Sequence, residues 1–430
     1  MLNPLLALVQ GSHEVTVACY FEHTPYMVER YRKAGAQVLL FSPEGARTHG
    51  YRAIPYLYKH LRRTIKAVRP DVAHVQYMAP GAMVILLLWL LGVKNIIATA
   101  HTSADIYKDL RLIHFLQRHI LRAFTCITER AEQGFFGSSQ LYTTEMVLGK
   151  RNHFTIYNCL QPHPTPLQGE RGLGHPGSNS KHYTLHATQE DLTQNSQKTH
   201  CCARVGHPDE DSQRLNVDEN LFQDVSDTTT QKKNSAMSAA PSPSGEGWGE
   251  APILGVVSRL EPIKGMDLVV PAFAEVLKKF PEVRLLVVGD GSLRATMEQQ
   301  AEELGCADRI TWVGRQPQEE LSHWYRQMDI VLMPSRSEGF GLTAIEAMAN
   351  GCVMVASNVG GLPEVVRDGV CGLLHCTEDV KDMAAKVCML LDDAVLYDKL
   401  RTQSMIEVEK YSFERYATLV NDLYDKLFRI

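Results

Sequence analysis

The stretch that decides the fold reads SRSEGFGLTAIEAMANGCVMVASNVGGLPE and runs from Ser335 to Glu364. It follows the apolar residues 329–333, which favour a strand, and it contains two turns that lead from a strand into a helix. The first turn, residues 338–341, opens a predicted helix whose apolar residues Leu342, Ile345 and Met348 recur at helical spacing. Glycines allow a ligand to approach the backbone, and the N–H groups at a helix start favour an anion. This turn is therefore expected to hold a phosphate.

Two carboxylates, Glu338 and Glu346, flank this turn, and they need hydroxyl groups or cations as partners beside a phosphate. A nucleotide sugar supplies hydroxyl groups at both of its ends. The E-x7-E spacing from Glu338 to Glu346, the Gly-Phe-Gly inside it and the Gly-Gly-x-Pro-Glu at 360–364 together resemble retaining glycosyltransferases of family 4. Two domains are expected from 430 residues, and the resemblance implies the GT-B fold, an α/β architecture with two Rossmann-like parallel-sheet domains facing each other across a cleft.

The resemblance also implies roles for individual residues. Arg259 and Lys264 would hold the donor diphosphate, Glu346 the ribose, and Glu338 with the backbone N–H groups of the turn the sugar. His101 comes directly after a predicted strand and would bind the same sugar from the other domain. A single histidine is more often structural, and it is the resemblance that favours function here. The expected catalytic residues are His101, Glu338, Arg259 and Lys264, and the expected nucleotide-binding residues are Gly289, Gly291, Arg315, Gly339, Phe340, Gly341, Leu342 and Glu346.

Strands and helices alternate in both halves of the chain, which is typical of parallel sheets with covering helices. We expect an acceptor-side domain at 1–162, a disordered low-complexity insertion at 163–250, and a nucleotide-sugar-binding domain at 251–430 whose last helix crosses back to the first domain. The insertion is rich in Gly, Ser, Thr, Asn and Pro and lacks apolar periodicity. The alternative, a functional tether or lid, stays open.

The start of the chain departs from the family pattern. Residues 13–20, HEVTVACY, correspond to the second strand of the family, and nothing in residues 1–12 fits its first strand and glycine-rich loop. The sequence therefore predicts that this first strand is missing, as in a truncated or misannotated product, unless Leu5 to Gln10 stands in for it. A missing central strand would remove hydrogen bonds from the sheet and a loop from the acceptor site.

Charge is distributed unevenly, because residues 1–164 carry 18 Lys and Arg against 10 Asp and Glu. Much of this excess of positive charge lies on a predicted amphipathic helix at 51–68. Its basic face either is simply solvated or binds an anionic membrane or a phosphorylated acceptor. The longest apolar run, residues 82–91, is too short to span a bilayer. Without an evident signal peptide, the chain is expected in the cytoplasm, with peripheral contact at the inner face of the membrane. No nucleic-acid-binding motif is present.

Cofactors and metals are not expected. The Gly289-Asp290-Gly291-Ser292 turn lacks the third glycine of a dinucleotide fingerprint, and the ten cysteines show no paired zinc spacing. His200, Cys201, Cys202 and His207 could hold a metal only if the insertion were ordered. Cations at Arg259 and Lys264 would stabilise the leaving diphosphate without a metal.

These observations predict a retaining, metal-independent glycosyltransferase that moves a sugar from a nucleoside diphosphate to an acceptor hydroxyl. Polysaccharide or glycolipid synthesis at the cell envelope is the expected setting, with a glycan, a lipid-linked molecule or a small molecule as acceptor. Two alternatives remain: a sugar-nucleotide-binding remnant without a complete acceptor site, and another GT-B enzyme such as a phosphorylase or epimerase.

Overall fold

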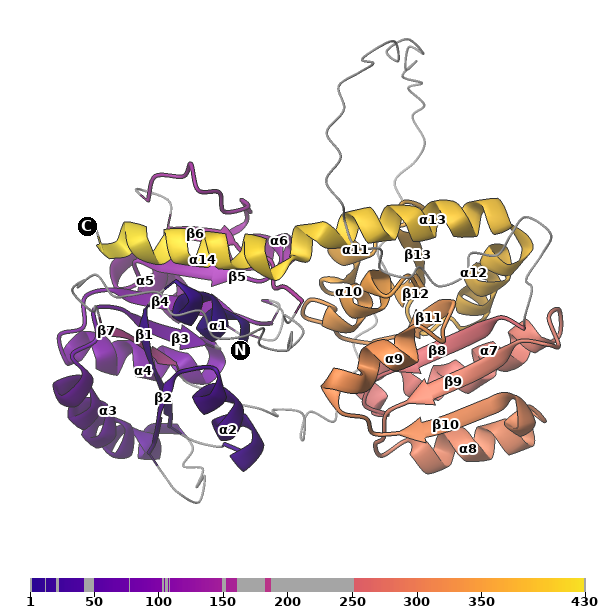
Figure 1. Cartoon of the computed structure of the whole chain (residues 1–430). Coiled ribbons are helices and arrows are strands. Elements are labelled where there is room, and N and C mark those ends of the chain that lie inside the picture. Colours follow the sequence, from indigo (N-terminus) through magenta and orange to yellow (C-terminus); the bar gives the residue numbers. More distant parts are fainter. Residues whose placement is uncertain are drawn as a thin grey trace, which may run out of the picture. The chain divides into compact units, whose positions relative to one another are not determined.

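Three parallel sheets form the framework of the protein in this computed structural model (Figure 1). The structure describes residues 2–11, 13–20, 23–41, 50–76, 78–102, 104, 107, 109–148, 152–160, 182–186 and 251–428. All of them belong to one compact unit of the chain. The α/β fold class predicted from the sequence is confirmed. Whether the chain divides into domains at residues 162 and 250 stays a prediction.

The amino-terminal half contains two of the sheets. The first has the order β2-β1-β7 and the second the order β3-β4-β5-β6, and every pair of neighbours is parallel. Their strands are β1 (Glu14–Cys19), β2 (Gln37–Leu40), β3 (Ala73–Gln76), β4 (Ile96–Ala100), β5 (Ala123–Cys126), β6 (His153–Thr155) and β7 (His182–His186). Strands β1, β3, β4 and β5 are buried almost throughout, as expected for parallel strands covered on both faces.

Strand β7 corrects two predictions. It lies within the segment predicted to be disordered, and it pairs with β1 in parallel, with Glu14 opposite His182 and Val17 opposite His186. It also lies beside β3 and so links the two sheets. The place next to β1 that was predicted to lack its strand is therefore occupied by residues from later in the chain. Composition could not reveal this, because the hydrogen bonds of a strand come from its neighbours. The rest of 163–250 lies outside the described residues.

Helices cover both faces of these sheets. They are α1 (Leu2–Gln10), α2 (Pro25–Lys33), α3 (Ile54–Val68), which follows the short 3₁₀ helix η1 (Gly50–Ala53), α4 (Met78–Leu90), α5 (Arg111–His119) and α6 (Glu129–Phe136). Residues of α3, α4, α5 and α6 join one apolar core, and residues of α1 and α2 join another. Leu5 to Gln10 is therefore helical and does not replace a strand. Its apolar residues bury one side of a helix, with Leu5 and Leu8 at 1% and 0% exposure.

The carboxyl-terminal half contains one six-stranded parallel sheet of order β10-β9-β8-β11-β12-β13. Its strands are β8 (Ile253–Val257), β9 (Arg284–Val288), β10 (Ile310–Gly314), β11 (Ile330–Met333), β12 (Val353–Ser357) and β13 (Gly372–His375). Helices α7 (Val269–Leu277), α8 (Arg294–Glu303), α9 (Leu321–Tyr325), α10 (Leu342–Ala349), α11 (Leu362–Val365), α12 (Val380–Asp392) and α13 (Ala394–Glu407) surround it. Short 3₁₀ helices complete the loops: η3 (Pro262–Lys264), η4 (Met266–Leu268), η5 (Ala307–Arg309), η6 (Gln318–Glu320) and η7 (Val408–Tyr411). The order reverses between β8 and β11, where ligands of such sheets bind.

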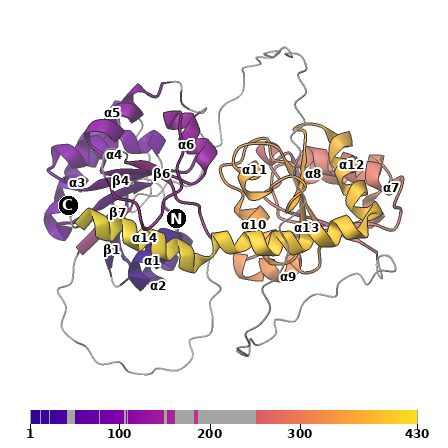
Figure 2. The ribbon, with the colours of Figure 1, turned by 90° about the horizontal axis from the view of Figure 1, so that it is seen from above.

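The last helix, α14 (Phe413–Phe428), packs on the amino-terminal half (Figures 1 and 2). It lies beside α1, and the Asn421 side chain donates a hydrogen bond of 3.0 Å to the carbonyl oxygen of Ala7. Leu423 and Tyr424 are buried in the same core as Leu5 and Leu8. This helix therefore forms part of the amino-terminal core.

Candidate active site

A cavity of about 240 Å³ opens at the carboxyl ends of β8 and β11. Arg259 and Lys264, five residues apart in the loop after β8, both line it. Residues of both strands, of the loops after them, of η4 and of α10 complete its walls: Val257, Ser258, Met266, Leu332, Met333, Ser335 and Thr343. The cavity contains two cations and no carboxylate among its lining residues, so it suits an anionic ligand.

Lys264 is held by Glu338, one of the two predicted carboxylates. Its Nζ atom lies 2.7 Å from Oε2 of Glu338, and the two side chains are 21% and 14% exposed. A charge-assisted hydrogen bond at this depth restricts the ammonium group to one place. Glu338 therefore positions Lys264 at the cavity, a contact that the spacing in the sequence did not predict.

A second cation, Arg336, fixes the loop that carries Lys264. Its guanidinium group donates to both carboxylate oxygens of Asp267 at 2.7 and 2.8 Å, and to both oxygens of Glu378 at 2.6 and 2.8 Å. These hydrogen bonds lower the pKa of Asp267 and raise that of Arg336. We call the three residues the Arg336 clamp. It ties the end of β11 to the segment 262–268, which contains η3 and η4.

The turn before α10 has the geometry expected of an anion-binding loop. Gly341 caps α10 with a φ of 103°, in the left-handed region where glycine is favoured. Among the described residues, the N–H groups of Gly339, Phe340 and Gly341 donate no hydrogen bond. The side chain of Phe340 is buried against Tyr157 and Tyr411, whereas Leu342 is 37% exposed. Phe340, one of the predicted nucleotide-binding residues, can therefore bind a ligand through its backbone N–H group and not through its aromatic ring.

The second turn, residues 358–364, is already engaged within the protein. The N–H group of Gly361 donates to the carbonyl oxygen of Glu338 at 3.1 Å. The Glu364 carboxylate accepts from the N–H groups of Glu129 and Arg130 at 2.8 and 2.6 Å, at the start of α6. The Gly361 N–H group thus stabilises the first turn, and the Glu364 carboxylate stabilises the start of α6. The prediction that the second turn adds N–H donors for a ligand therefore does not hold for Gly361.

Glu346 lies on α10 and is only partly exposed. Its carboxylate accepts hydrogen bonds from the Tyr325 hydroxyl at 3.2 Å and from the Gln318 amide at 3.4 Å. Burial raises its pKa, and the two hydrogen bonds oppose this shift. Tyr325 and Gln318 thus orient the carboxylate that the sequence assigned to the ribose.

The remaining predicted nucleotide-binding residues lie in the loops after β9 and β10. A Cβ atom on Gly289 would lie 1.8 Å from the Ser258 carbonyl oxygen, and one on Gly291 would lie 2.5 Å from that of Leu260. Both glycines are therefore required for the loops after β8 and β9 to pack. Arg315 is exposed after β10, and no hydrogen bond or ion pair within the described residues joins it to the others.

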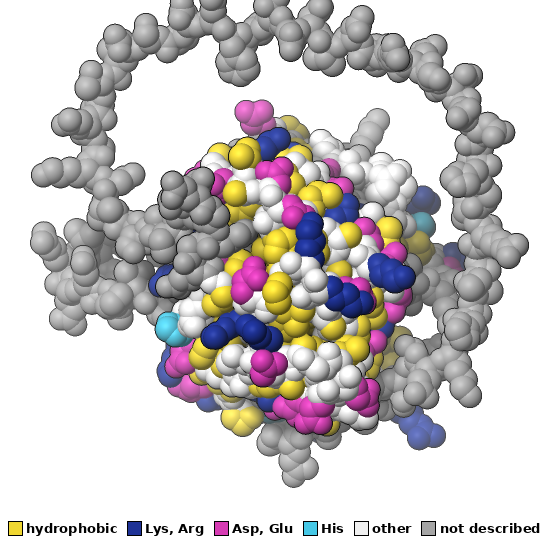
Figure 3. Space-filling view, turned by 90° about the vertical axis from the view of Figure 1, so that its right-hand side faces the viewer, with side chains coloured by type: hydrophobic (Ala, Val, Ile, Leu, Met, Phe, Trp, Pro, Cys, Tyr) yellow, Lys and Arg dark blue, Asp and Glu magenta, His cyan; other side chains and the backbone are white. Residues whose placement is uncertain are grey.

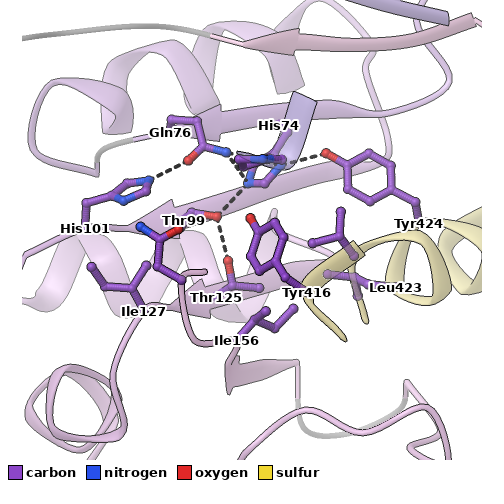
Figure 4. A pocket seen from close by; sticks show the side chains of 13 residues that line it. His74, Gln76, Thr99, His101, Thr125, Ile127, Ile156, Tyr416, Leu423 and Tyr424 are labelled. Carbon is purple, nitrogen blue, oxygen red and sulfur yellow. Dashed lines mark hydrogen bonds between the residues drawn. The ribbon is translucent and has the colours of Figure 1, made fainter. Parts of the chain in front are cut away.

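His101 follows β4, and its Nε2 atom lies 2.6 Å from Oε1 of Gln76, which ends β3 (Figure 4). Burial lowers the pKa of His101 to about 3, so the imidazole is neutral at pH 7. A Cβ atom on Gly339 would lie 2.7 Å from the His101 carbonyl oxygen. The structure thus places the backbone of His101 beside the turn that carries Glu338.

Several residues around these groups were missed by sequence reasoning. They are Arg336 and Asp267 of the clamp, Tyr325 and Gln318 at Glu346, and His74, Gln76, Thr99, Thr125 and Tyr424 behind His101. The position of Gln76 did contain a signal, because the carboxyl ends of neighbouring parallel strands meet at one edge. Tyr424 gave none, since it approaches from a distant helix.

Comparison with family models decides the relationship. Residues 5–133 match the model described as Glycosyltransferase Family 4, and residues 243–405 match the model described as Glycosyl transferases group 1. Over these two segments the chain is similar to glycosyltransferases of group 1 and of family 4. The two matches fall on the two halves that the sheets define, and the second contains the whole cavity with the Arg336 clamp up to Glu378.

Curated relatives match only part of the chain. The D-inositol 3-phosphate glycosyltransferase of Segniliparus rotundus is 46% identical over 143 residues, which are 32% of this chain and 32% of that protein. The enzyme of the same name from Nocardia farcinica is 40% identical over 161 residues, 36% of this chain and 35% of that protein. The chain thus spans about a third of the length of the curated relatives it matches.

Solved structures match along almost the whole chain and show the fold. The Anabaena protein Alr3699/HepE in complex with UDP and glucose has a TM-score of 0.63 at 15% identity, covering 99% of this chain and 95% of that one. Sucrose-phosphate synthase from Thermosynechococcus elongatus has a TM-score of 0.62 at 18% identity, covering 99% and 92%. Both neighbours are glycosyltransferases of the GT-B fold, as the sequence predicted for this chain.

Membrane spans and metal clusters were sought in the described part of the chain. None of its helices combines the length and the apolar character needed to cross a bilayer. No group of three or more His, Cys, Asp or Glu side chains there is arranged to hold a metal ion. The histidines and cysteines at 200–207 lie outside the described residues.

Proposed function

We propose that the chain is a retaining, metal-independent glycosyltransferase that transfers a sugar from a nucleoside diphosphate to an acceptor hydroxyl group. The observation that carries this proposal is the cavity where Arg259 and Lys264 meet at the ends of β8 and β11, beside the helix-start turn of α10. Two cations that line one cavity suit a diphosphate, and N–H groups at a helix start nearby favour an anion.

The donor would occupy this edge of the carboxyl-terminal sheet. Arg259 and Lys264 bind the diphosphate, with Lys264 kept in place by Glu338 at 2.7 Å. Glu346, oriented by Tyr325 and Gln318, accepts hydrogen bonds from the ribose hydroxyls. Glu338 and the N–H groups of the first turn bind the sugar, and His101 contacts it from the end of β4. Gly289, Gly291 and Arg315 lie at the base end of the nucleotide.

In the proposed reaction, the bond between the anomeric carbon and the donor phosphate oxygen breaks while the acceptor oxygen bonds to the same carbon. The acceptor proton passes to the departing phosphate oxygen, and the anomeric configuration is retained. Arg259 and Lys264 stabilise the negative charge that develops on the diphosphate. The family resemblance supports this front-face course.

We propose the acceptor by its chemical class. Relatives named D-inositol 3-phosphate glycosyltransferases match about a third of this chain, which makes a phosphorylated polyol one acceptor to test. We also propose an acceptor from cell-envelope glycan or glycolipid synthesis, and the basic surface of α3 supports this second proposal.

Strand β7 favours an active enzyme over the sugar-nucleotide-binding remnant. The remnant hypothesis rests on an empty strand position beside β1, and β7 fills this position by parallel pairing. With β7 in place, strands β1, β7, β3 and β4 lie side by side. This row of strands supports the carboxyl end of β3, where Gln76 lies, and that of β4, which His101 follows. In the proposed complex, His101 contacts the sugar from the end of β4.

Helix α3 is the proposed site of peripheral contact with an anionic membrane. Residues 52–69 hold six exposed cations and no Asp or Glu: Arg52, Lys59, Arg62, Arg63, Lys66 and Arg69. Neighbouring helices α4 and α5 expose Trp89, Leu90 and Phe115, at 50%, 67% and 49%. On the face shown in Figure 3, by contrast, basic and acidic side chains are interspersed. Cations beside exposed apolar groups suit a lipid headgroup region.

Donor turnover tests the proposed reaction. Purified chain is incubated with UDP-glucose, GDP-mannose or ADP-glucose plus a chelator, and released sugar is followed by proton NMR, which reports the anomer formed first. Slow release of the α-anomer from an α-linked donor, accelerated into transfer by inositol phosphate or a lipid-linked acceptor, is expected. Binding without release would favour the remnant, and release of the inverted anomer would contradict the retaining mechanism.

Vesicle sedimentation tests the membrane surface. The full chain is expected to sediment with vesicles containing anionic phosphatidylglycerol and to stay in the supernatant with neutral phosphatidylcholine. Reversing the charge of Arg62 and Arg63 to Glu should release it, because each cation near the surface contributes about 1 kcal/mol. The matched control is Lys381→Glu on α12, which should leave sedimentation unchanged. Equal binding of all three proteins would refute the assignment to α3.

A further inference from the structure

A basic cavity lies in the amino-terminal half, at the opposite edge of the sheet from His101. It has a volume of about 590 Å³ and opens where α4 and α5 end and where β4, β5 and β6 begin. Lys94, Arg118, His119 and Arg122 line it, and its lining residues include no Asp or Glu. The whole length of β4 separates this basic cavity from His101, so the cavity is not part of the candidate active site.

The three cations of the basic cavity have no carboxylate partner within the described residues. None of them takes part in an ion pair there, and all three side chains are exposed. From residue 72 to residue 128 the sequence contains only two acidic residues, Asp105 and Asp109, and both come between β4 and α5. The loops that form the cavity therefore carry positive charge that their own sequence does not neutralise.

Helix ends account for only part of this charge. Arg118 and His119 lie in the last turn of α5, where a cation complements the partial negative charge of the helix end. Lys94 and Arg122 lie outside the helices, just before β4 and β5. Neither a helix end nor an ion pair explains why these two cations line the same cavity as Arg118. An anionic ligand explains it, and guanidinium groups match the geometry of phosphate in particular.

Hydrogen bonds fix the backbone from which the two arginines emerge. The Asn152 amide group donates to the carbonyl oxygens of Gln117 and Leu121, at 2.9 Å each. The N–H group of Arg122 donates to the Ile96 carbonyl oxygen at 2.9 Å, which joins the start of β5 to β4. A ligand therefore has to order side chains only, which lowers the entropy cost of binding.

Trp89 adds an aromatic wall to the basic cavity. Its side chain is 50% exposed at the end of α4, while Val93, Ile120 and Leu121 are buried and contribute apolar lining. The volume lies in the range of pockets that hold small molecules. An indole ring offers a large flat apolar surface, and the carbon-bound hydrogens of a sugar or polyol ring can stack on it.

We propose that the basic cavity is a second, non-catalytic site that binds a phosphorylated sugar or polyol, either free or as the headgroup of a phospholipid. The phosphate group lies among Arg118, Arg122 and Lys94, and the ring stacks on Trp89. This inference goes beyond the proposed function, because binding at this edge of the sheet requires neither the donor nor the cavity at the ends of β8 and β11.

Tryptophan fluorescence of the full chain tests the site, with myo-inositol 1-phosphate as the probe. We expect this compound to change the emission of Trp89, inorganic phosphate to compete only at concentrations at least about tenfold higher, and unphosphorylated myo-inositol not to bind. Trp89→Phe should abolish the change in emission, because none of the other three tryptophans lines the cavity. An undiminished response in Trp89→Phe would contradict the proposal.

Charge variants locate the phosphate group. Arg118→Gln combined with Arg122→Gln should weaken binding of myo-inositol 1-phosphate at least about tenfold. Arg111→Gln is the matched control, since it removes a charge from the start of the same helix, where the side chain is 93% exposed, and should leave binding unchanged. Lys264→Met alters the proposed donor site and should also leave it unchanged. Normal binding by the double variant, or loss of binding in Lys264→Met, would overturn the proposal.

Vesicles distinguish the two sources of the ligand. The chain with Arg62→Glu and Arg63→Glu, which lacks the proposed membrane contact of α3, is sedimented with phosphatidylcholine vesicles that contain phosphatidylinositol. Sedimentation that Arg118→Gln with Arg122→Gln prevents supports the lipid headgroup, and fluorescence binding without sedimentation supports the free compound. Binding of neither contradicts the proposal. A chain that responds at Trp89 but turns over no donor would refute the proposed function alone.

Discussion

At the scale of single residues, the site depends on carboxylates that hold other groups in place. Glu338 fixes Lys264 at 2.7 Å, and Glu346 is itself fixed by Tyr325 and Gln318. Burial raises the pKa of Glu346, which shows that its charged form loses water in the protein. A ligand hydroxyl that donates to this carboxylate replaces part of that lost hydration. Glu346 is therefore expected to contribute more to nucleotide binding than an exposed carboxylate would.

Removing the Glu346 carboxylate is expected to weaken nucleotide binding. Glu346→Ala loses a charge-assisted contact to the ribose, and the dissociation constant should rise by a factor that corresponds to at least about 1.5 kcal/mol. Calorimetric titration with the nucleotide that binds the wild-type chain measures the change. Glu275→Ala, on the outside of α7, is the matched control and should bind normally. Equal affinity of the two variants would remove Glu346 from the site.

At the scale of elements, the Arg336 clamp makes a rigid unit of the segment 262–268 and the end of β11. Gly265 belongs to this unit, since its φ is 66° and a Cβ atom there would lie 2.0 Å from the Pro334 carbonyl oxygen. Close backbone contact and a bidentate ion pair both fix where Lys264 emerges. The loop is therefore in place before a ligand arrives, which lowers the entropy cost of binding.

The clamp should give stability a dependence on pH. Arg336 lowers the pKa of Asp267, so the ion pair contributes fully above the ordinary aspartate pKa of about 3.9 and is lost as the pH falls through the lower folded-state value. We expect Asp267→Asn to lower the unfolding free energy by about 1 kcal/mol at pH 7, with the difference shrinking as the pH falls below the ordinary aspartate pKa. Urea unfolding of both proteins across pH 3–7 measures this. A difference that stayed constant would refute the linkage.

Strand β7 is the element whose loss should damage the amino-terminal half. Leu185 lies opposite Thr16 in the parallel ladder, and a proline there removes a backbone N–H group from the strand that pairs with β1. We expect Leu185→Pro to lower the unfolding free energy by about 2 kcal/mol, whereas Leu185→Val keeps the strand and should cost much less. Thermal unfolding compares the two. Identical stability of both variants would show that β7 contributes nothing to the sheet.

At the scale of the whole molecule, the sequence predicted what depends on local pattern. Apolar periodicity gave both series of strands and helices, and the string 335–364 gave the turn before α10 and its two carboxylates. Local sequence patterns could not predict contacts between segments that lie far apart in the chain. Tyr424 reaches His74 across 350 positions and Arg336 reaches Asp267 across 69, so no spacing rule could join them. Strand β7 was missed for the same reason, because its partner β1 lies far away in the sequence.

Removal of metal ions tests how the site stabilises the negative charge of the leaving diphosphate. Two cations and the N–H groups of the α10 turn face the diphosphate in the proposed complex, so no metal is needed to stabilise the leaving group. Dialysis against a chelator is therefore expected to leave donor turnover unchanged. Loss of turnover that Mg²⁺ or Mn²⁺ restores would contradict the proposed role of Arg259 and Lys264.

The most direct measurement is the calorimetric titration of the full chain with UDP, GDP and ADP in the presence of a chelator, repeated for Lys264→Met and for Lys278→Met. Lys278 is 69% exposed and pairs with Glu275 at the surface, which makes it a matched control. We predict that one nucleotide binds the wild-type chain and the control equally and binds Lys264→Met at least about tenfold more weakly. Binding that does not depend on Lys264, or no binding of any of the three nucleotides, would contradict the assignment of the donor site to the ends of β8 and β11.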